Sequence, residues 1–304
     1  MKRTLVFQIL FLAAAYRAAV AIEAPIGFVS RAGDRSIVLH WDRNSEPNLS
    51  GYRVYRSLSN GGPFVAQSPS LVTSQGFCDL SVNVVNGQTN FYQVTALTTT
   101  AQESLPSATL AVVPHPFASD SEFLEYVQEC NFDYFWYLAN PANGLVPDRS
   151  ATGSACSIAA VGFGLTAIGI GIDHGWISRT QGVARVLRTL NTFLLGPQGP
   201  STSGTIGYKG WFYHFLDMNT ALRSGSELSS IDTTLLLAGM LYCKQYFDGT
   251  NTDETTIRTT VDAIFNRVDW NWMARGANVV SMGWNPPGSF LSGNWIGYDE
   301  GMIL

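Results

Sequence analysis

The first third of the chain alternates apolar and polar residues, and a period of two is typical of strands. The run "RSIVLHWDR" places Ile37, Leu39 and Trp41 on one face, and "GYRVYRS" and "NFYQVTALT" repeat the alternation further along. Turn-rich segments such as "NSEPNLSG" and "SNGGP" separate these runs. Several short strands with this spacing predict a β-sandwich over residues 25–113.

A linker with two prolines at 114–119 ends this part, and the apolar period then changes to three and four residues. That period predicts helices, and the segments between them are rich in Gly, Pro, Trp and Asn. Helices joined by such loops pack on one another and gather the loops at one end, as in an α/α toroid; a plain helical bundle is the alternative. We expect helices from Ser119 or Ser121 to Leu138, and at Ser157–Ile172, Thr180–Leu195, Ser230–Phe247 and Glu254–Val268, the last capped by Thr252 or Asp253.

The N-terminus has the three regions of a signal peptide. Two basic residues precede an apolar run at 5–16, and small residues end in the triplet "AVA". We expect cleavage after Ala21, which removes residues 1–21 and exports the mature chain to the periplasm or beyond the cell. An uncleaved anchor helix is the alternative, but the run is shorter than the ~20 residues that a membrane span needs.

A second apolar stretch, Ala155 to Ile172, is nearly long enough to cross a membrane and contains several glycines. Small residues let helices pack closely, and no basic residues flank the stretch. We therefore interpret it as a buried core helix, with a membrane helix as the alternative. No stable membrane span is expected after cleavage of the signal peptide.

The four cysteines, Cys78, Cys130, Cys156 and Cys243, show no CxxC spacing and no paired histidines. We expect mostly free, buried thiols, with a Cys130–Cys156 disulfide as the alternative. The sequence also lacks a nucleophile elbow, an H-E-x-x-H motif, a P-loop and a dinucleotide-binding motif. No metal or cofactor is expected.

Composition narrows the range of partners. The net charge is −5, and the 18 Lys and Arg residues form no cluster. Because a nucleic-acid-binding protein needs a basic surface, we expect no nucleic acid partner. Eight Trp and twelve Tyr beside few charges suit a flat, neutral ligand such as a sugar, although a large core uses aromatic residues as well.

The strand-rich part resembles a fibronectin type III domain. The resemblance rests on Pro25, on Trp41 in the second strand, on "LSGYRVYRS", on "NGQTNFYQVTAL" with Tyr92 as the tyrosine-corner candidate, and on the closing "SLPSATLAVVP". It implies a spacer or a binding module, and we assign no chemistry to it.

From Asp120 to Leu304 the chain resembles the glucoamylase-like domain family of bacterial proteins. Matching blocks include "FDYFWYLANPANGLVPDRS", "GTIGYKGWFYHFLDMNT", "SELSSIDTTLLLAGML" and "SMGWNPPGSFLSGNWIGYDEGM". The resemblance implies an (α/α)6 toroid and a glycoside hydrolase acting on β-glucan, with endo-β-1,2-glucanase as the best-defined activity. Residues 120–304 hold too few helices for a closed toroid, so we expect a partial domain.

Glycoside hydrolysis needs two carboxyl groups, one to donate a proton and one to activate water or attack the sugar. Glu227, in "SGSELSSIDTT", is our candidate for the general acid, and a helix-capping partner is its structural alternative. Asp148, Asp217 and Glu300 are candidates for the base or the group that positions water. The alternative for Asp148 is a turn aspartate paired with Arg149, and for Asp217 a buried structural aspartate.

We interpret two further carboxylates as structural: Asp133 inside the first helix, and Asp232 in the first turn of another helix, where it offsets the helix dipole. Aromatic faces pair with the C–H faces of sugars, and Lys, Arg or His can bond their hydroxyl groups; the alternative is that these residues only fill the loop layer. The residues predicted to contact substrate are Arg149, Tyr208, Lys209, Trp211, His214, Trp284, Trp295 and Tyr298.

The sequence therefore predicts an exported glycoside hydrolase that binds a β-glucan oligosaccharide or polysaccharide and cleaves β-1,2-glucan internally. A carbohydrate-binding protein without catalysis is one alternative, and a phosphorolytic enzyme on the same scaffold, which needs inorganic phosphate, is another. Inversion or retention of the sugar configuration depends on whether the carboxyl groups lie ~6.5–9.5 Å or ~5–5.5 Å apart.

Overall fold

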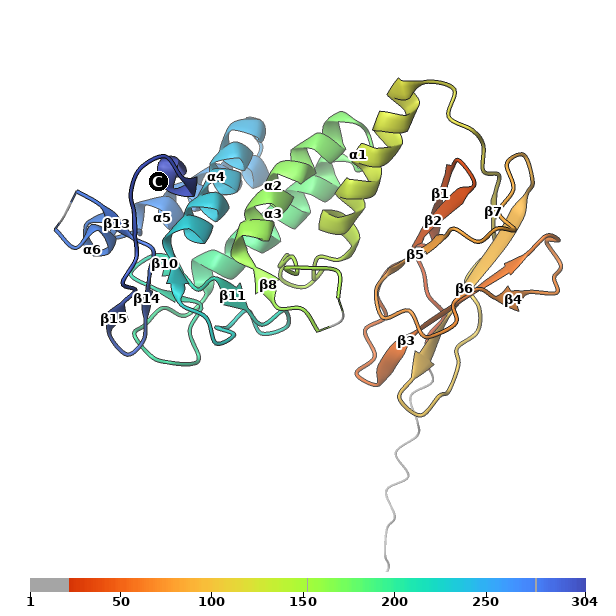
Figure 1. Ribbon diagram of the computed structural model, residues 1–304, viewed down its shortest axis with the longest axis horizontal. Helices are drawn as coiled ribbons and strands as arrows, with labels where there is room; N and C mark the ends of the chain where they lie inside the picture. The colour runs from red at the N-terminus through yellow and green to blue at the C-terminus, as the bar shows by residue number, and fades with distance from the viewer. Residues whose placement is uncertain (1–21, 152, 277) are drawn as a thin grey trace, which may run out of the picture.

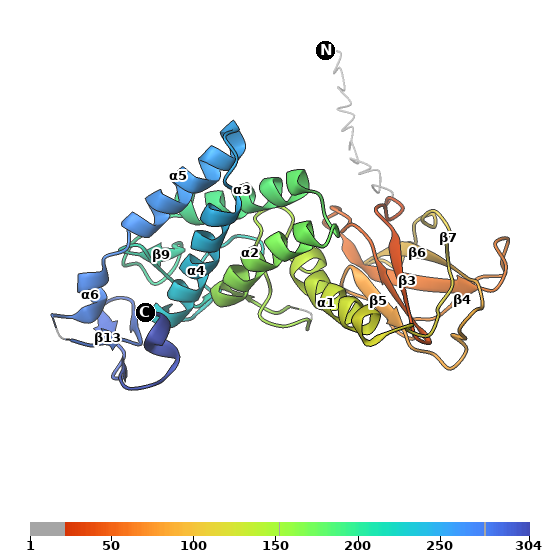
Figure 2. The same ribbon diagram turned by 90° about the horizontal axis from the view of Figure 1, so that it is seen from above.

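The computed structural model describes residues 22–151, 153–276 and 278–304. The predicted signal peptide lies outside these residues. Two parts follow each other along the chain: strands up to Val112, and then helices with short strands between them (Figure 1). In Figure 2 the first helix, α1, lies between the strand-rich part and the other helices.

The strands up to Val112 form two antiparallel sheets. The first sheet has the order β1-β2-β5, with β1 at Val29–Gly33, β2 at Ser36–His40 and β5 at Gly76–Asp79. The second has the order β4-β3-β6-β7, with β4 at Val65–Ala66, β3 at Leu49–Ser57, β6 at Asn90–Thr98 and β7 at Leu110–Val112.

The two sheets share one hydrophobic core. Ile37, Leu39 and Trp41 are fully buried, as their alternation predicts, and they pack in one cluster with Tyr52 of β3 and Val94 of β6. Because side chains alternate between the faces of a strand, each sheet contributes one apolar face to this core.

A buried polar group lies at the edge of this core. The hydroxyl of Tyr92, the tyrosine-corner candidate, donates to the carboxylate of Asp79 at 2.8 Å, and Arg56 donates to the same oxygen at 2.8 Å. Tyr92 therefore forms its hydrogen bond with the side chain of Asp79. The same carboxylate supplies the counter-charge for the buried guanidinium of Arg56.

Five long helices confirm the predicted segments. They are α1 at Asp120–Tyr137, α2 at Ile158–Asp173, α3 at Arg179–Leu195, α4 at Ser230–Tyr246 and α5 at Thr252–Asn266. Side-chain oxygens of Ser119, Ser157, Ser178, Ser229 and Asn251 cap their N-termini. The predicted caps of α5 are wrong, because Asn251, one residue earlier, accepts the hydrogen bond from the Glu254 amide.

Helices α2 and α4 pack closely where each carries a glycine. A Cβ added to Gly239 would lie 2.2 Å from the carbonyl oxygen of Gly162. A Cβ added to Gly162 would lie 2.3 Å from the carbonyl oxygen of Leu235. Most of the apolar segment of α2 is thus buried within the helical core, although Phe163 and Ile170 are exposed. Among the described residues we find no helix with the length and hydrophobicity of a membrane span.

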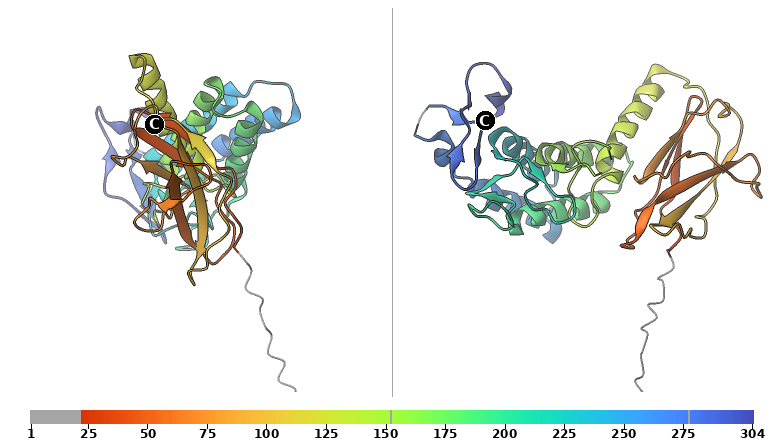
Figure 3. Two further views of the ribbon diagram at one scale, coloured as in Figure 1. Left: turned by 90° about the vertical axis from the view of Figure 1, so that its right-hand side faces the viewer. Right: turned by 60° about the horizontal axis from the view of Figure 1, so that its bottom comes forward.

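Short strands and turns gather at one end of the helices (Figures 1 and 3). Strand β8 at Cys156–Ser157 leads directly into α2, and β12 at Leu228–Ser229 leads directly into α4, so both helices begin at this end. The remaining elements are β9 at Gly207–Tyr208, β10 at Trp211–Phe212, β11 at Phe215–Leu216, α6 at Trp270–Ala274, β13 at Val280–Ser281, β14 at Gly283–Asn285, β15 at Ser289–Phe290, β16 at Asn294–Trp295 and the 3-10 helix η1 at Glu300–Ile303.

All four described cysteines are free thiols. Cys156 and Cys243 are buried, Cys130 is half-buried and Cys78 is exposed. Burial raises the pKa of the Cys130, Cys156 and Cys243 thiols. The structure therefore agrees with free thiols and not with a Cys130–Cys156 disulfide.

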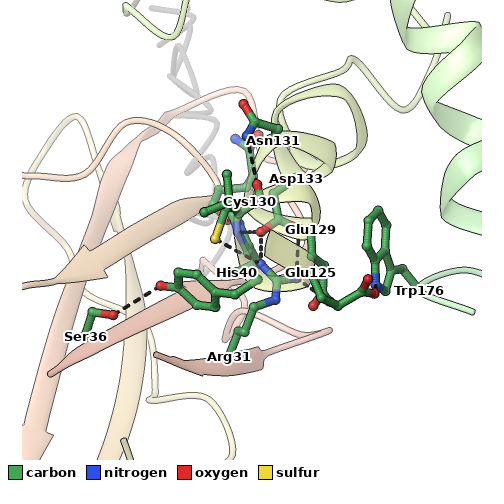
Figure 4. Close-up of polar contacts among 12 residues, drawn as sticks. Arg31, Ser36, His40, Glu125, Glu129, Cys130, Asn131, Asp133 and Trp176 are labelled. Carbon is green, nitrogen blue, oxygen red and sulfur yellow. Dashed lines mark hydrogen bonds and ion pairs between the residues drawn. The ribbon is translucent and has the colours of Figure 1, made fainter. Parts of the chain in front are cut away.

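Polar contacts join α1 to the β1-β2-β5 sheet (Figure 4). Asp133 is only 5% exposed; its carboxylate accepts from the guanidinium of Arg31 and lies 3.0 Å from Nε2 of His40. Arg31 also pairs with Glu129 at 2.6 Å, and the ring of Tyr137 stacks on that of His40 with centroids 4.1 Å apart. These contacts confirm a structural role for Asp133, and its partners come from the other part of the chain.

Replacing Asp133 with alanine is expected to lower the free energy of unfolding by about 3 kcal/mol, because Arg31 loses a buried counter-charge and His40 loses its hydrogen-bond partner. Denaturant titration followed by circular dichroism measures this loss. The matched control is Glu129→Gln, which removes the more exposed partner of Arg31 and is expected to cost less than about 1 kcal/mol. Equal losses in the two variants would contradict the importance of the buried pair.

The contribution of Asp133 depends on pH. Burial alone would raise the pKa of Asp133, but hydrogen bonds from His40 and Arg31 outweigh that effect and lower it. A carboxyl group with a lowered folded-state pKa stabilises fully above its unfolded pKa of ~3.9, and this contribution is lost as the pH falls further. The difference between the parent chain and Asp133→Ala should therefore shrink below about pH 4.

Candidate active site

An open pocket of about 750 Å³ lies at the loop end of the helices, where α2 and α4 begin. Its wall combines carboxylates, a histidine, a tryptophan and apolar side chains. The lining residues are Phe163, His214, Glu227, Ser229, Ile231, Asp232, Leu235, Met282, Leu291, Trp295, Glu300 and Ile303.

Two antiparallel segments bring Glu227 and His214 together. Tyr213 and Leu228 form a β-bridge, and the amide of His214 donates to the carbonyl oxygen of Glu227 at 2.9 Å. Residues opposite each other in an antiparallel pair have neighbouring side chains. Nδ1 of His214 accordingly lies 3.1 Å from Oε1 of Glu227.

The start of α4 adds a second carboxylate. Ser229 caps the helix by accepting from the Asp232 amide, and its hydroxyl donates to the Asp232 carboxylate. The other oxygen of Asp232 lies 3.5 Å from Nε2 of His214. Asp232 is therefore both a first-turn helix residue, as interpreted from the sequence, and a member of the pocket wall.

These contacts change the charges of the pocket. Burial of the His214 ring opposes protonation, but the bond with Glu227 and the charges of Asp232 and Asp148 outweigh it and raise the pKa of His214. The hydrogen bond from His214 lowers the pKa of Glu227, against the opposing effect of partial burial. The arrangement favours an imidazolium beside an ionised Glu227, whereas a general acid normally has a raised pKa.

One tryptophan contributes an aromatic surface to the pocket. Trp295 lines it, and the indole nitrogen donates to the hydroxyl of Ser230 at 2.8 Å, which fixes the ring direction. Phe163 and Ile303 line the same pocket and remain exposed. Carboxylates beside aromatic and apolar faces form a surface suited to an uncharged sugar.

The structure also places the other predicted carboxylates. Glu300 lines the pocket from η1. Asp148 is held by its neighbour Arg149, whose Nη2 lies 2.6 Å from the carboxylate, and its charge reaches His214. Asp217 accepts three hydrogen bonds from Asn219 and Thr220 and thus closes its own turn, outside the pocket lining.

Four of the predicted contact residues lie in a separate aromatic layer. Trp211 is fully buried, and its indole nitrogen donates to the carbonyl oxygen of Asp269 at 3.0 Å. Tyr208 packs against Trp284, and Lys209 pairs with the Asp269 carboxylate at 2.8 Å. None of these four residues is in the pocket lining.

Two predicted contact residues lie elsewhere. Tyr298 is 94% exposed. Arg149 lines a second groove of about 220 Å³, between the strand-rich part and the helical part, together with Arg43 and Gln75. His214 and Trp295 are thus the predicted contact residues that share the pocket with Glu227.

Sequence reasoning did not place Asp232, Ser229, Phe163, Met282 or Leu291 in the site. The serine and aspartate of "LSSID" have the pattern of a helix cap, which explains them without chemistry. The apolar residues look like core residues in sequence. Within residues 22–151, 153–276 and 278–304, no group of three His, Cys, Asp or Glu is arranged to hold a metal ion.

No protein-family model matches the chain. The chain is 30% identical over 303 residues to the exo-β-1,2-glucooligosaccharide sophorohydrolase (non-reducing end) of Parabacteroides distasonis, a match that includes 93% of this chain and 39% of the relative. The crystal structure of a β-1,2-glucanase from the same organism has a TM-score of 0.76 and 28% identity, over 93% of this chain and 40% of that one.

A third relative is the endo-β-1,2-glucanase of Chitinophaga pinensis, solved with sophorotriose and glucose. It has a TM-score of 0.53 and 25% identity, over 62% of this chain and 46% of that one. The chain spans about two fifths of the length of the two Parabacteroides proteins.

These likenesses agree with the predicted resemblance, because the proteins that the chain is similar to are glycoside hydrolases by name. The named relatives are proteins that act on β-1,2-glucan or its oligosaccharides.

Proposed function

We propose that the chain hydrolyses β-1,2-glucan in the pocket that Glu227, His214, Trp295 and Glu300 line. The observation that carries the proposal is the placement of Glu227 in an open pocket beside an oriented indole ring, at the loop end of the helices. The relationship to enzymes of β-1,2-glucan supplies the substrate class.

The pocket offers the groups that hydrolysis needs. Glu227 is one of the two carboxyl groups; Glu300, which lines the same pocket, and Asp148, whose charge acts on His214, are the candidates for its partner. Our sequence-based candidate for the general acid is Glu227, and that role requires its proton to return when the sugar displaces water from the pocket. Trp295 offers a face for a glucose ring.

We further propose that the strand-rich part, residues 25–113, is a fibronectin type III-like module that serves as a spacer or binds glucan. Residues 120–304 form part of an (α/α)6 toroid. The chain is exported after cleavage at Ala21, so that it meets extracellular or periplasmic glucan.

The test is a reducing-end assay of the chain on linear β-1,2-, β-1,3- and β-1,4-glucan in phosphate-free buffer, with product sizes read by chromatography. We expect reducing ends from the β-1,2 polymer alone, with products of several lengths if cleavage is internal. Sophorose as the sole product would overturn internal cleavage. If the release of sugar required added phosphate, the reaction would be phosphorolysis and not hydrolysis. If no polymer released sugar, carbohydrate binding without catalysis would be the remaining function.

A further inference from the structure

His214 is flanked by a carboxylate at each ring nitrogen. Oε1 of Glu227 lies 3.1 Å from Nδ1, and Oδ1 of Asp232 lies 3.5 Å from Nε2. The two carboxylates come from different elements, the segment before β12 and the first turn of α4. A histidine between two carboxylates has donors on both sides only when it is protonated.

The ring of His214 has little freedom to turn. The backbone of His214 donates to Glu227 at 2.9 Å and accepts from the amide of Ile158 at 3.2 Å, which ties it to the start of α2. The ring stacks on Phe215 with centroids 3.8 Å apart and 17° between the planes. The hydroxyl of Ser229 in turn holds Asp232.

Two further charged side chains act on this group, and a third lines the same pocket. Asp148, from the loop after α1, adds negative charge near His214. The charge of Arg223 helps to lower the pKa of Glu227, and its guanidinium donates to backbone oxygens of Ser226 and Thr202. Glu300 lies on the pocket wall formed by η1. No lysine lines the pocket among the described residues.

We propose that His214 is a positioning residue for Glu227: held between Glu227 and Asp232, its ring fixes the direction of the Glu227 carboxylate and governs whether that carboxylate carries a proton. This inference rests on the proposed function, because it assigns Glu227 to the reaction. It adds a residue that acts through Glu227 and need not touch the glucan, whereas sequence reasoning placed His214 against substrate.

The pH dependence of hydrolysis tests the inference, with His214→Ala and His214→Asn as the variants. Loss of the imidazolium raises the pKa of Glu227 by about one unit or more, so the limb of the kcat profile that reports Glu227 should move to higher pH. A shifted acid limb would mean that Glu227 acts ionised, and a shifted alkaline limb that it acts as the proton donor. Both results support the inference.

The two variants distinguish the effect of His214 on the orientation of the Glu227 carboxylate from its effect on the charge of that carboxylate. Asparagine keeps a donor near the position of Nδ1, so His214→Asn should retain kcat within about tenfold at its own optimum, whereas His214→Ala should lose about a hundredfold. Variants that lose kcat with unmoved limbs would overturn the inference and leave His214 a structural residue.

A readout without hydrolysis keeps the inference separate from the proposed function. Nitrogen-15 NMR of the histidine rings, assigned with His214→Asn, follows the titration of His214 in the parent chain and in Glu227→Gln. We expect Glu227→Gln to lower the pKa of His214 by about one unit. An unchanged titration would overturn the inference, even in an active enzyme. A chain that shows this coupling but releases no sugar would overturn the proposed function alone.

Discussion

Glu227→Gln is expected to reduce the hydrolysis of β-1,2-glucan by about 10³-fold, the usual range for loss of a group that transfers a proton in the transition state. Glutamine keeps the size of the side chain and a hydrogen bond toward His214, so the pocket should keep its shape. The measurement is kcat for reducing-end release by the parent chain and the variant, at the pH optimum of the parent chain. Circular dichroism shows whether both are folded.

The matched control is Asp217→Asn. Asp217 is a second carboxylate that the sequence nominated, but its oxygen accepts from Asn219 and Thr220 within its own turn. We expect this variant to keep kcat within about threefold, as for a change outside the group that transfers the proton. If Asp217→Asn were as inactive as Glu227→Gln, the assignment of the active site to the Glu227 pocket would be contradicted.

Gly239→Ala is expected to destabilise the chain by about 2 kcal/mol, although alanine is the better helix former by ~1 kcal/mol. The new methyl group would lie 2.2 Å from the carbonyl oxygen of Gly162 and 2.8 Å from its Cα. Backbone atoms of a packed helix cannot rotate away, so α2 and α4 must separate and lose contacts along their interface. Denaturant titration followed by helical circular dichroism measures the change.

Gly164→Ala is the matched control, because Gly164 also lies inside a helix of the same core. Its nearest neighbours would be side-chain atoms of Val146 and Phe135 at 3.2 and 3.3 Å, which can shift slightly. We expect a change within about 1 kcal/mol of the parent chain. Equal destabilisation in both variants would show that the close approach of α2 and α4 is not the cause.

Local pattern was sufficient to predict the helices and the core strands. Alternation placed Ile37, Leu39 and Trp41 on one face, and all three are buried. Pattern could not show which helices meet. The glycines of α2 signalled close packing, but only the structure pairs Gly162 with α4.

The contact between the two parts was also beyond sequence reasoning. Asp133 follows a phenylalanine inside an amphipathic helix, and nothing local indicates that Arg31 and His40 lie against it. Ion pairs between residues about a hundred positions apart depend on how the parts dock, and docking is a tertiary property.

The candidate site was predicted in part. The motif containing Glu227 indicated a carboxylate before a helix, and the structure places it in the pocket. Its pairing with His214 depends on the antiparallel register of two short segments, which sequence does not determine. Trp211 and Trp295 look equivalent in sequence, yet one is fully buried in the loop layer and the other lines the pocket.

The most direct test of the central claim is a crystal structure of the Glu227→Gln chain with a linear β-1,2-glucooligosaccharide. We expect the sugar to lie in the pocket with one ring against Trp295, and with a glycosidic oxygen within about 3 Å of the residue 227 amide, the reach that proton transfer requires. An oligosaccharide bound at another surface, with this pocket empty, would contradict the claim that Glu227 acts on glucan.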